Sequence, residues 1–407
     1  MNMRLLAGAA AIGLAACATG ARAQDFGAPM QIGDGVTFDP IVDANVRYEH
    51  VEQAGIANDA DAVTLRVRLG GEVKAEGFSL LAEGEGTVAL DDHYNDTLPG
   101  NGVEPYPTVP DPENIELNRL QVSYMKNGTG VTVGRQRIIL DNARFVGNVG
   151  WRQNEQTFDA IRGQASLGPV HLDATYAISQ RTVFGYHSPN EHFDGDFELL
   201  NARVDLKRVK LAGFAYLIDY DTRVALSSQT YGVLASGALP VGGGVQLIGL
   251  ASFATQSDMG ANPVNYTADY LNFEAGLGIA GFSLKGGYEK LGSDHGVAAF
   301  QTPLATLHAF NGWADVFLTT PSAGLRDRYV SAAYKFAKVR ALPGLNVAAS
   351  YHWFGSDVGA VDYGREFDAS IGFKLGAVGL LAKYADYNSD GFAADTRKFW
   401  LQASLAL

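Results

Sequence analysis

The chain has 407 residues, with 31 Lys and Arg against 44 Asp and Glu, a formal net charge of −13. Only 18% of residues are charged, compared with roughly 25% in soluble domains, and 48 glycines exceed the usual ~7%. After the N-terminus no apolar run reaches the ~20 residues of a membrane helix, which excludes a helical membrane protein. The acidic balance argues against a nucleic-acid partner. A soluble all-β protein or a membrane β-barrel remains.

Residues 1–23 have the form of a secretory signal peptide. Arg4 precedes an apolar stretch, and Ala21-Arg22-Ala23 offers a small-x-small cleavage site. The stretch that ends at Cys17 also resembles a lipoprotein box, which is an alternative interpretation of the same segment. Cleavage after Ala23 leaves 384 residues and removes two arginines, so the net charge becomes −15. It also removes the only cysteine, so an exported chain needs another means of stabilisation, which a closed hydrogen-bonded barrel supplies.

From Val36 onward, apolar and polar residues alternate with the period of a β-strand. In residues 63–69, for example, Val and Leu at odd positions alternate with Thr and Arg at even positions. We count eighteen candidate strands, and each has about 21 residues including its connection, enough for the ~9–11 residues of a membrane strand. They begin near Val42, Val63, Leu80, Arg119, Val131, Thr157, Val170, Leu200, Leu211, Ser228, Val245, Tyr270, Phe282, Tyr329, Leu345, Phe367, Val378 and Lys398.

Every second connection is short, and the intervening ones are long and polar. The long ones span residues 91–114, 140–156, 181–196, 256–268 and 294–327. Outer-membrane barrels sort their connections in this way, with short periplasmic turns and long external loops, whereas a soluble β-sandwich has no reason to do so. The sequence therefore predicts an all-β fold: residues 24–407 form one transmembrane antiparallel β-barrel of about eighteen strands.

The charged face of each strand is expected to line the lumen. An Arg or Lys on the lipid face costs ~2–4 kcal/mol at the bilayer midplane, so the strand cations must point inward. Those expected to line the pore are Arg66, Arg68, Arg119, Arg203 and Lys335, and Lys374 and Lys383 are assigned to the same inward face. Carboxylates such as Glu83 and Glu85 share that face, so each cation can alternatively be satisfied by an ion pair inside the barrel. The mixed charges predict a lumen that is water-filled or plugged.

Four arginines gather in one strand–loop–strand unit: Arg135, Arg137, Arg144 and Arg152. Guanidinium groups suit bidentate contacts with carboxylates. The run of residues 134–147, continued by 151–160, closely resembles the alginate-export family of bacterial outer-membrane barrels. The stretches 302–315, 318–321 and 324–327 resemble another hallmark of that family.

This resemblance implies an eighteen-stranded channel for an acidic polysaccharide, with those four arginines making the lumen electropositive. We therefore expect passive export or diffusion of an anionic poly- or oligosaccharide through a pore lined by these and the strand cations. The alternatives are a general or substrate-selective porin for small anions or sugars, and a plugged structural barrel. Expected partners are outer-membrane lipids, lipopolysaccharide, the solute and periplasmic export proteins, with the barrel a monomer in the bacterial outer membrane. The last residue, Leu407, departs from the terminal Phe usual in such barrels.

The 294–327 connection contains the only helix-like pattern after the signal segment. Apolar residues recur at three- and four-residue spacing from Leu304 to Phe317, with Pro303 near the expected helix start. We expect a short helix that forms a lid or constriction over the lumen, or alternatively packs on the rim. The eight histidines show no metal-ligand spacing, and no catalytic or nucleotide-binding motif appears, so we expect no metal, cofactor or enzymatic activity.

Overall fold

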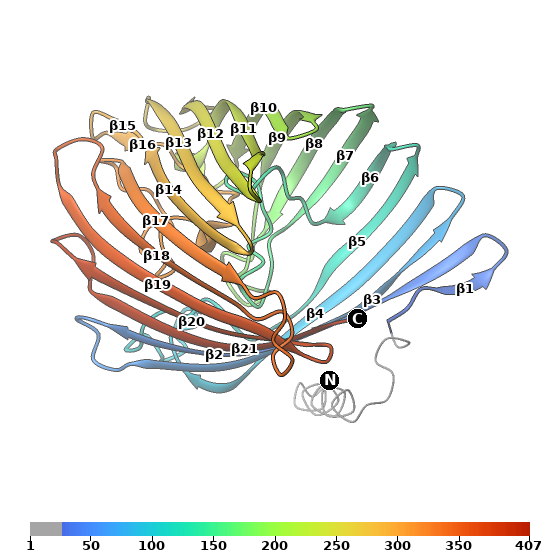
Figure 1. Cartoon of the computed structure of the whole chain (residues 1–407), viewed down its shortest axis with the longest axis horizontal. Coiled ribbons are helices and arrows are strands. Elements are labelled where there is room, and N and C mark those ends of the chain that lie inside the picture. The colour runs from blue at the N-terminus through green and yellow to red at the C-terminus, as the bar shows by residue number, and fades with distance from the viewer. Residues whose placement is uncertain (1–26) are drawn as a thin grey trace.

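The computed structural model describes residues 27–407, which form a closed barrel of eighteen antiparallel strands (Figure 1). The strands are β2 (Val36–Gln53), β3 (Ala60–Ala75), β4 (Phe78–His93), β5 (Asn114–Lys126), β6 (Thr129–Gln136), β7 (Thr157–Leu167), β8 (Val170–Arg181), β9 (His192–Leu206), β10 (Val209–Tyr220), β11 (Ser228–Gly242), β12 (Val245–Asp258), β13 (Thr267–Ile279), β14 (Phe282–Leu291), β17 (Leu325–Lys335), β18 (Asn346–Gly355), β19 (Asp362–Leu375), β20 (Val378–Ser389) and β21 (Thr396–Ala406). Each strand pairs with its neighbour in sequence, and β2 closes the ring against β21, from Asp43↔Ala406 to Gln53↔Thr396. The predicted barrel is confirmed, with all eighteen strands in the predicted places.

A few elements lie outside this wall. The short strand β1 (Met30–Gly33) pairs with the start of β2, and β15 (Ser293–Asp294) pairs with β16 (Ala298–Ala299) in a small hairpin. In the part of the chain that the structure describes, no helix is both long and apolar enough to cross a membrane. The expected signal peptide and Cys17 lie outside the described residues.

The two ends of the barrel differ in their connections. Seven of the eight connections at one end, the short-turn end, have two residues, and the eighth spans residues 336–345. Asn127 and Gly128 form one such turn with φ of +52° and +77°, as a type I′ hairpin turn requires. At the other end, the long-loop end, connections reach 20 residues at 94–113 and 137–156 and 33 residues at 292–324. The predicted sorting of connections is therefore present.

Alternation along the strands separates an apolar outer face from a polar inner face. On β9, the Leu200 side chain points outward and is 46% exposed, whereas its neighbour Asn201 points inward and donates to Asp141 Oδ2 at 2.6 Å. On β3, Arg66 and Arg68 are buried inside the barrel. A closed ring leaves no unpaired strand edge, so its backbone hydrogen bonds are satisfied within the wall.

The prediction of a helix between Leu304 and Phe317 is wrong. Only one 3-10 turn forms, at Leu307–Ala309. The backbone at Asn311 (φ +57°), Gly312 (φ +85°) and Asp315 (φ +62°) is left-handed, which a right-handed helix cannot accommodate. The apolar spacing reflects packing instead: Leu304 and Phe317 are buried in the core cluster inside the barrel.

Two long connections fold into the barrel, and we call residues 137–156 and 300–322 the inner segments. They touch each other through a parallel bridge between Val146 and Leu304, where Gly147 N–H donates to the Leu304 carbonyl at 2.8 Å. Phe145 packs on Phe300 of the other inner segment, with ring centroids 6.0 Å apart. The hydrophobic core of the molecule thus lies within the bore, between these segments and the inner face of the wall.

Candidate channel interior

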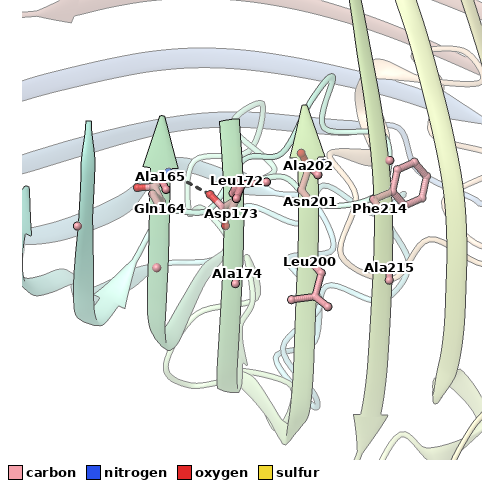
Figure 2. Close-up of a pocket in the computed structure, with 13 residues that line it drawn as sticks. Gln164, Ala165, Leu172, Asp173, Ala174, Leu200, Asn201, Ala202, Phe214 and Ala215 are labelled. Atoms are coloured by element: carbon pink, nitrogen blue, oxygen red, sulfur yellow. Dashed lines mark hydrogen bonds between the residues drawn. The ribbon is translucent and has the colours of Figure 1, made fainter. Parts of the chain in front are cut away.

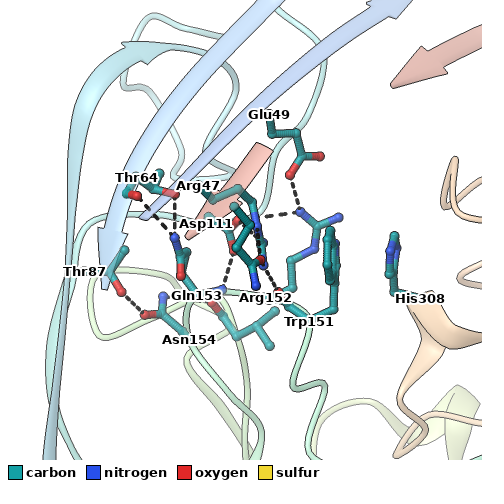
Figure 3. Close-up of polar contacts among 12 residues, drawn as sticks. Arg47, Glu49, Thr64, Thr87, Asp111, Trp151, Arg152, Gln153, Asn154 and His308 are labelled. Carbon is teal, nitrogen blue, oxygen red and sulfur yellow. Dashed lines mark hydrogen bonds and ion pairs between the residues drawn. The ribbon is translucent and has the colours of Figure 1, made fainter. Parts of the chain in front are cut away.

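The inner segment 137–156 crosses the bore from wall to wall. Its Arg144 donates Nε–H to Glu289 Oε1 on β14 at 2.7 Å, and its Glu155 accepts from Asn118 Nδ2 on β5 at 2.7 Å. Strands β5 and β14 stand nine places apart in the ring of eighteen, on opposite sides. Figure 3 shows the neighbouring Gln153 hydrogen bonded to the wall, where its Nε2 meets Thr64 Oγ1 at 2.8 Å.

The inner segment 300–322 also spans opposite walls. The Pro303 carbonyl accepts from Gln180 on β8 at 3.2 Å, and Ala314 N–H donates to Glu366 Oε1 on β19 at 2.7 Å. Strands β8 and β19 are again nine places apart. The two segments together therefore divide the bore rather than lining its rim.

Eight of the nine predicted pore cations are paired with carboxylates. Arg152 is bound by Glu49 at 3.1 Å (Figure 3). It also pairs with Asp315 at 2.6 Å, and its side chain is 5% exposed. The other pairs are Arg66–Asp43, Arg68–Glu85, Arg119–Glu83, Arg135–Asp159, Arg137–Glu155, Arg144–Glu289 and Arg203–Asp205. Lys335, at the short-turn end, has no carboxylate partner among residues 27–407. Carboxylates therefore compensate the charge of each of the eight predicted arginines.

The ionisation of the inner segments is fixed by these pairs. Burial alone would raise the pKa of Glu155, but Arg68 and Arg137 outweigh it and hold that pKa at about 2. Burial would likewise raise the pKa of Asp315, whereas His308, Lys398 and Arg152 keep it well below its ordinary value. Both carboxylates are therefore ionised at neutral pH and serve as fixed anionic anchors.

An aromatic cage surrounds Lys383 of β20. Its Nζ lies 4.0 Å from the ring centroid of Trp151 and 3.8 Å from that of Trp313, both on inner segments. Lys383 donates to His308 Nε2 at 2.7 Å, so we assign the proton to Nδ1, which donates to Asp315 Oδ1 at 2.8 Å. Burial, reinforced by Lys383, lowers the pKa of His308 to about 3, so its ring is neutral.

Sequence reasoning missed this cage. Strand parity places Lys383 and Trp400 inside, but Trp151, Trp313 and His308 lie in connections that have no periodicity. The proximity of Trp151 and His308, whose rings stack 4.5 Å apart, depends on how two distant segments meet. No local signal could have identified it.

A chamber of about 680 Å³ remains at the long-loop end, next to the inner segments. Arg152 and His308 form part of its wall, and the loops 94–113, 182–191 and 221–227 complete it. Arg223 also lines this chamber; it is exposed and has no ion pair among the described residues. No sequence pattern distinguishes Arg223 from the other arginines.

A second depression, of about 600 Å³, lies against strands β7 to β10 (Figure 2). Its lining includes Leu172 and Leu200, which are on the outer face, and none of its residues belongs to an inner segment. Gln164 Nε2 donates to Asp173 Oδ2 at 3.0 Å across β7 and β8 there. This depression belongs to the wall and not to the path through the barrel.

One group of potential metal ligands comes together in the described part of the chain. It consists of Asp91, Asp92 and His93 at the end of β4. His93 Nδ1 is already 2.6 Å from Asp91 Oδ1, and Asp92 and His93 are exposed. These residues form a rim cluster away from the chamber.

A sequence model described as alginate export matches residues 29–232, half of the chain. The chain belongs to the alginate-export family. The first inner segment and all eight of the predicted arginines lie within this family match, whereas Lys335 lies outside it. The comparison with curated proteins returns no match.

Several solved structures have the same barrel fold as this member of the alginate-export family. OccK9 (OpdG) of Pseudomonas aeruginosa is 18% identical, with 91% of this chain and 99% of that chain covered and a TM-score of 0.68. OpdK of the same organism, solved with vanillate, is 15% identical (91% and 98% covered, TM-score 0.68). OccK2 (OpdF), also from Pseudomonas aeruginosa and in complex with glucuronate, is 14% identical (91% and 98% covered, TM-score 0.67). Family and fold are those of outer-membrane transport channels.

Proposed function

We propose that this protein is a narrow outer-membrane diffusion channel for small solutes that carry a carboxylate, of about the size of one uronic acid. The observation that carries the proposal is the division of the bore by the two inner segments. Barrels of 16–18 strands have room for an aqueous channel when nothing fills them. Here buried pairs such as Arg144–Glu289 fasten a segment across that space, and breaking one such pair costs about 3–5 kcal/mol.

The pairing of the arginines supports a carboxylate as the solute. A carboxylate in transit can exchange with a protein carboxylate on the same guanidinium, because the two make the same bidentate contact. This exchange needs arginines that water reaches. Arg137 and Arg203, 29% and 35% exposed, meet that condition, as Arg119 and Arg135 do to a lesser extent.

The buried arginines have a different role in the proposal. Arg66, Arg68, Arg144 and Arg152 are at most 7% exposed and fasten the inner segments or the wall. In this proposal the eight arginines expected to line a pore thus separate into four anchors and four accessible contacts. The solutes of the two relatives described above, vanillate and glucuronate, are small carboxylates and agree with this class.

Export of an anionic polysaccharide is the second candidate, and the family match favours it. A polymer occupies the whole length of a pore, so its passage requires the inner segments to move aside as units. In either case the protein is proposed to span the outer membrane as a monomer, in contact with lipids and lipopolysaccharide. Periplasmic export proteins are partners only in the polymer case.

Planar-bilayer recording and liposome uptake separate the two candidates. The full-length protein should give a small conductance, admit glucuronate and exclude oligouronates longer than a few units. Deletion of residues 300–322 should enlarge the single-channel current and admit the oligomers, because water then solvates the charges this segment covered. Shortening the exposed tip at residues 99–102 is the matched control and should leave the current unchanged.

Two results would overturn the proposal. Ready passage of long oligouronates through the intact protein would favour polymer export, and absence of any current would indicate a plugged barrel. An unchanged current after deletion of residues 300–322 would show that this segment does not set the constriction.

A further inference from the structure

The chamber at the long-loop end has a wall that is mostly apolar. Its side chains include Phe184, Val224, Leu226, Leu307 and Leu318. Its volume of about 680 Å³ lies within the ~300–1,000 Å³ of small-molecule sites, which are typically apolar with a few polar groups that set orientation. Such a wall suits a solute with an apolar body better than one covered in hydroxyl groups.

Building on the proposed function, we infer that this chamber selects small carboxylic acids with an apolar body, such as benzoate, and that Arg223 binds their carboxylate. Arg223 is the chamber's one cation without an ion pair among residues 27–407. Its guanidinium carbon lies 4.4 Å from the ring centroid of Phe193. A guanidinium stacked on an aromatic face keeps its N–H edge free for a bidentate carboxylate.

The other charged groups of the chamber wall are already neutralised. Arg152 and Asp315 pair with each other at 2.6 Å, and Arg152 also binds Glu49. His308 is buried and neutral, between Asp315 and Lys383. Among the residues that the structure describes, an incoming anion therefore meets one free positive charge in this chamber, at Arg223.

The amides that could bind sugar hydroxyls are also occupied. Gln180 donates to Gln156 Oε1 at 2.6 Å and accepts from Tyr220 at 2.7 Å. Gln156 Nε2 donates to the carbonyls of Gly147 and Leu304, and both amide atoms of Gln301 bond to the Thr320 backbone. Hydroxyls of a uronate would lose water without gaining these partners, which is costly, whereas an aromatic ring requires none.

Calorimetric titration of the detergent-purified full-length protein tests this inference separately from transport. Benzoate should bind at least 10-fold more tightly than glucuronate. Arg223→Gln should weaken benzoate binding by about 10-fold or more, as expected for a hydrogen-bonded charge, and Arg223→Lys should restore part of it. Leu318→Asn, at an exposed wall position, should weaken benzoate binding and narrow its preference over glucuronate.

Arg208→Gln is the matched control, because Arg208 is an exposed arginine without a carboxylate partner in the described chain, at the short-turn end. It should leave both affinities unchanged. Equal affinity for glucuronate and benzoate, or equal effects of Arg223→Gln and Arg208→Gln, would overturn the inference while leaving carboxylate transport intact. If liposomes with the protein admit no carboxylate but benzoate binding still depends on Arg223, the proposed function fails and the binding site stands.

Discussion

Arg144 and Glu289 are joined by a buried ion pair across the bore, although 145 residues separate them in the chain. Arg144 also donates to Thr302 Oγ1 at 3.0 Å and to Asn311 Oδ1 at 3.1 Å, so one side chain connects both inner segments to strand β14. The constriction is thus held by side-chain pairs and not by regular secondary structure.

Removing one partner of this pair should be more harmful than removing both. Arg144→Met leaves Glu289 buried without its cation and should lower the free energy of unfolding by about 3–5 kcal/mol. The double variant Arg144→Met/Glu289→Met should recover part of that loss. Urea unfolding in lipid vesicles measures both, and additive losses from the two single variants would contradict the coupling.

A side chain at residue 312 should displace the second inner segment. A Cβ at Gly312 would overlap the carboxylate of Glu366. Gly312→Ala should therefore increase the single-channel current and make it fluctuate between levels. Gly100→Ala is the control, since Gly100 also has a positive φ, +72°, but open space around its Cβ position. Identical recordings from the two variants would show that the close contact at residue 312 has no effect on the channel.

The neutral His308 should make the protein less stable in acid. Because the pKa of His308 is lowered to about 3, the unfolded chain takes up this proton near its ordinary pKa of 6.5 and the folded chain does not. The free energy of unfolding should then fall as pH drops from 6.5 towards 3, by up to about 1.4 kcal/mol per pH unit from this group. His308→Gln, which can keep both hydrogen bonds without titrating, should remove that part of the slope. Parallel unfolding-versus-pH curves for the two proteins would be the contrary result.

A charge should destabilise the protein much more on the outer face of β9 than on its inner face. Leu200→Arg places a cation on the lipid face and should cost about 2–4 kcal/mol of unfolding free energy if the residue lies near the bilayer midplane. Asn201→Arg points into the bore beside Asp141 and should cost much less. The comparison uses urea unfolding in vesicles, and equal losses would mean that the outer face does not contact lipid.

The wall could be predicted from the sequence because alternation has one physical cause along every strand. Leu200 is on the apolar outer face and Asn201 is on the polar inner face, so the alternation of apolar and polar residues indicates the two faces directly. The candidate strand starts at Leu80 and Tyr270, for example, lie inside β4 and β13. Short and long connections alternate along the chain, and this alternation indicates which connections lie at the same end of the barrel.

The bore could not be predicted in the same way. Asn311 and Asp315 adopt left-handed backbone conformations, which few non-glycine residues do, so the apolar spacing around them suggested a helix. The arginines stand out in the sequence, but their pairing with Glu289 or Asp315 depends on contacts between distant segments. Arg223 stands out only because no carboxylate of residues 27–407 forms an ion pair with it, a property that no local pattern encodes.

The pairing of β2 with β21 has a consequence for assembly. The hydrogen bond from Arg47 Nε to Gln402 Oε1 joins residues 355 apart, so the ring closes only when the last strand meets the first. Until then β2 and β20 present open edges that can pair with other chains. Once closed, the ring has no intrinsic first strand, and Gly27 lies against Leu407. A circularly permuted chain, joined there and opened at Asn127-Gly128, would therefore keep every strand pair of the wall.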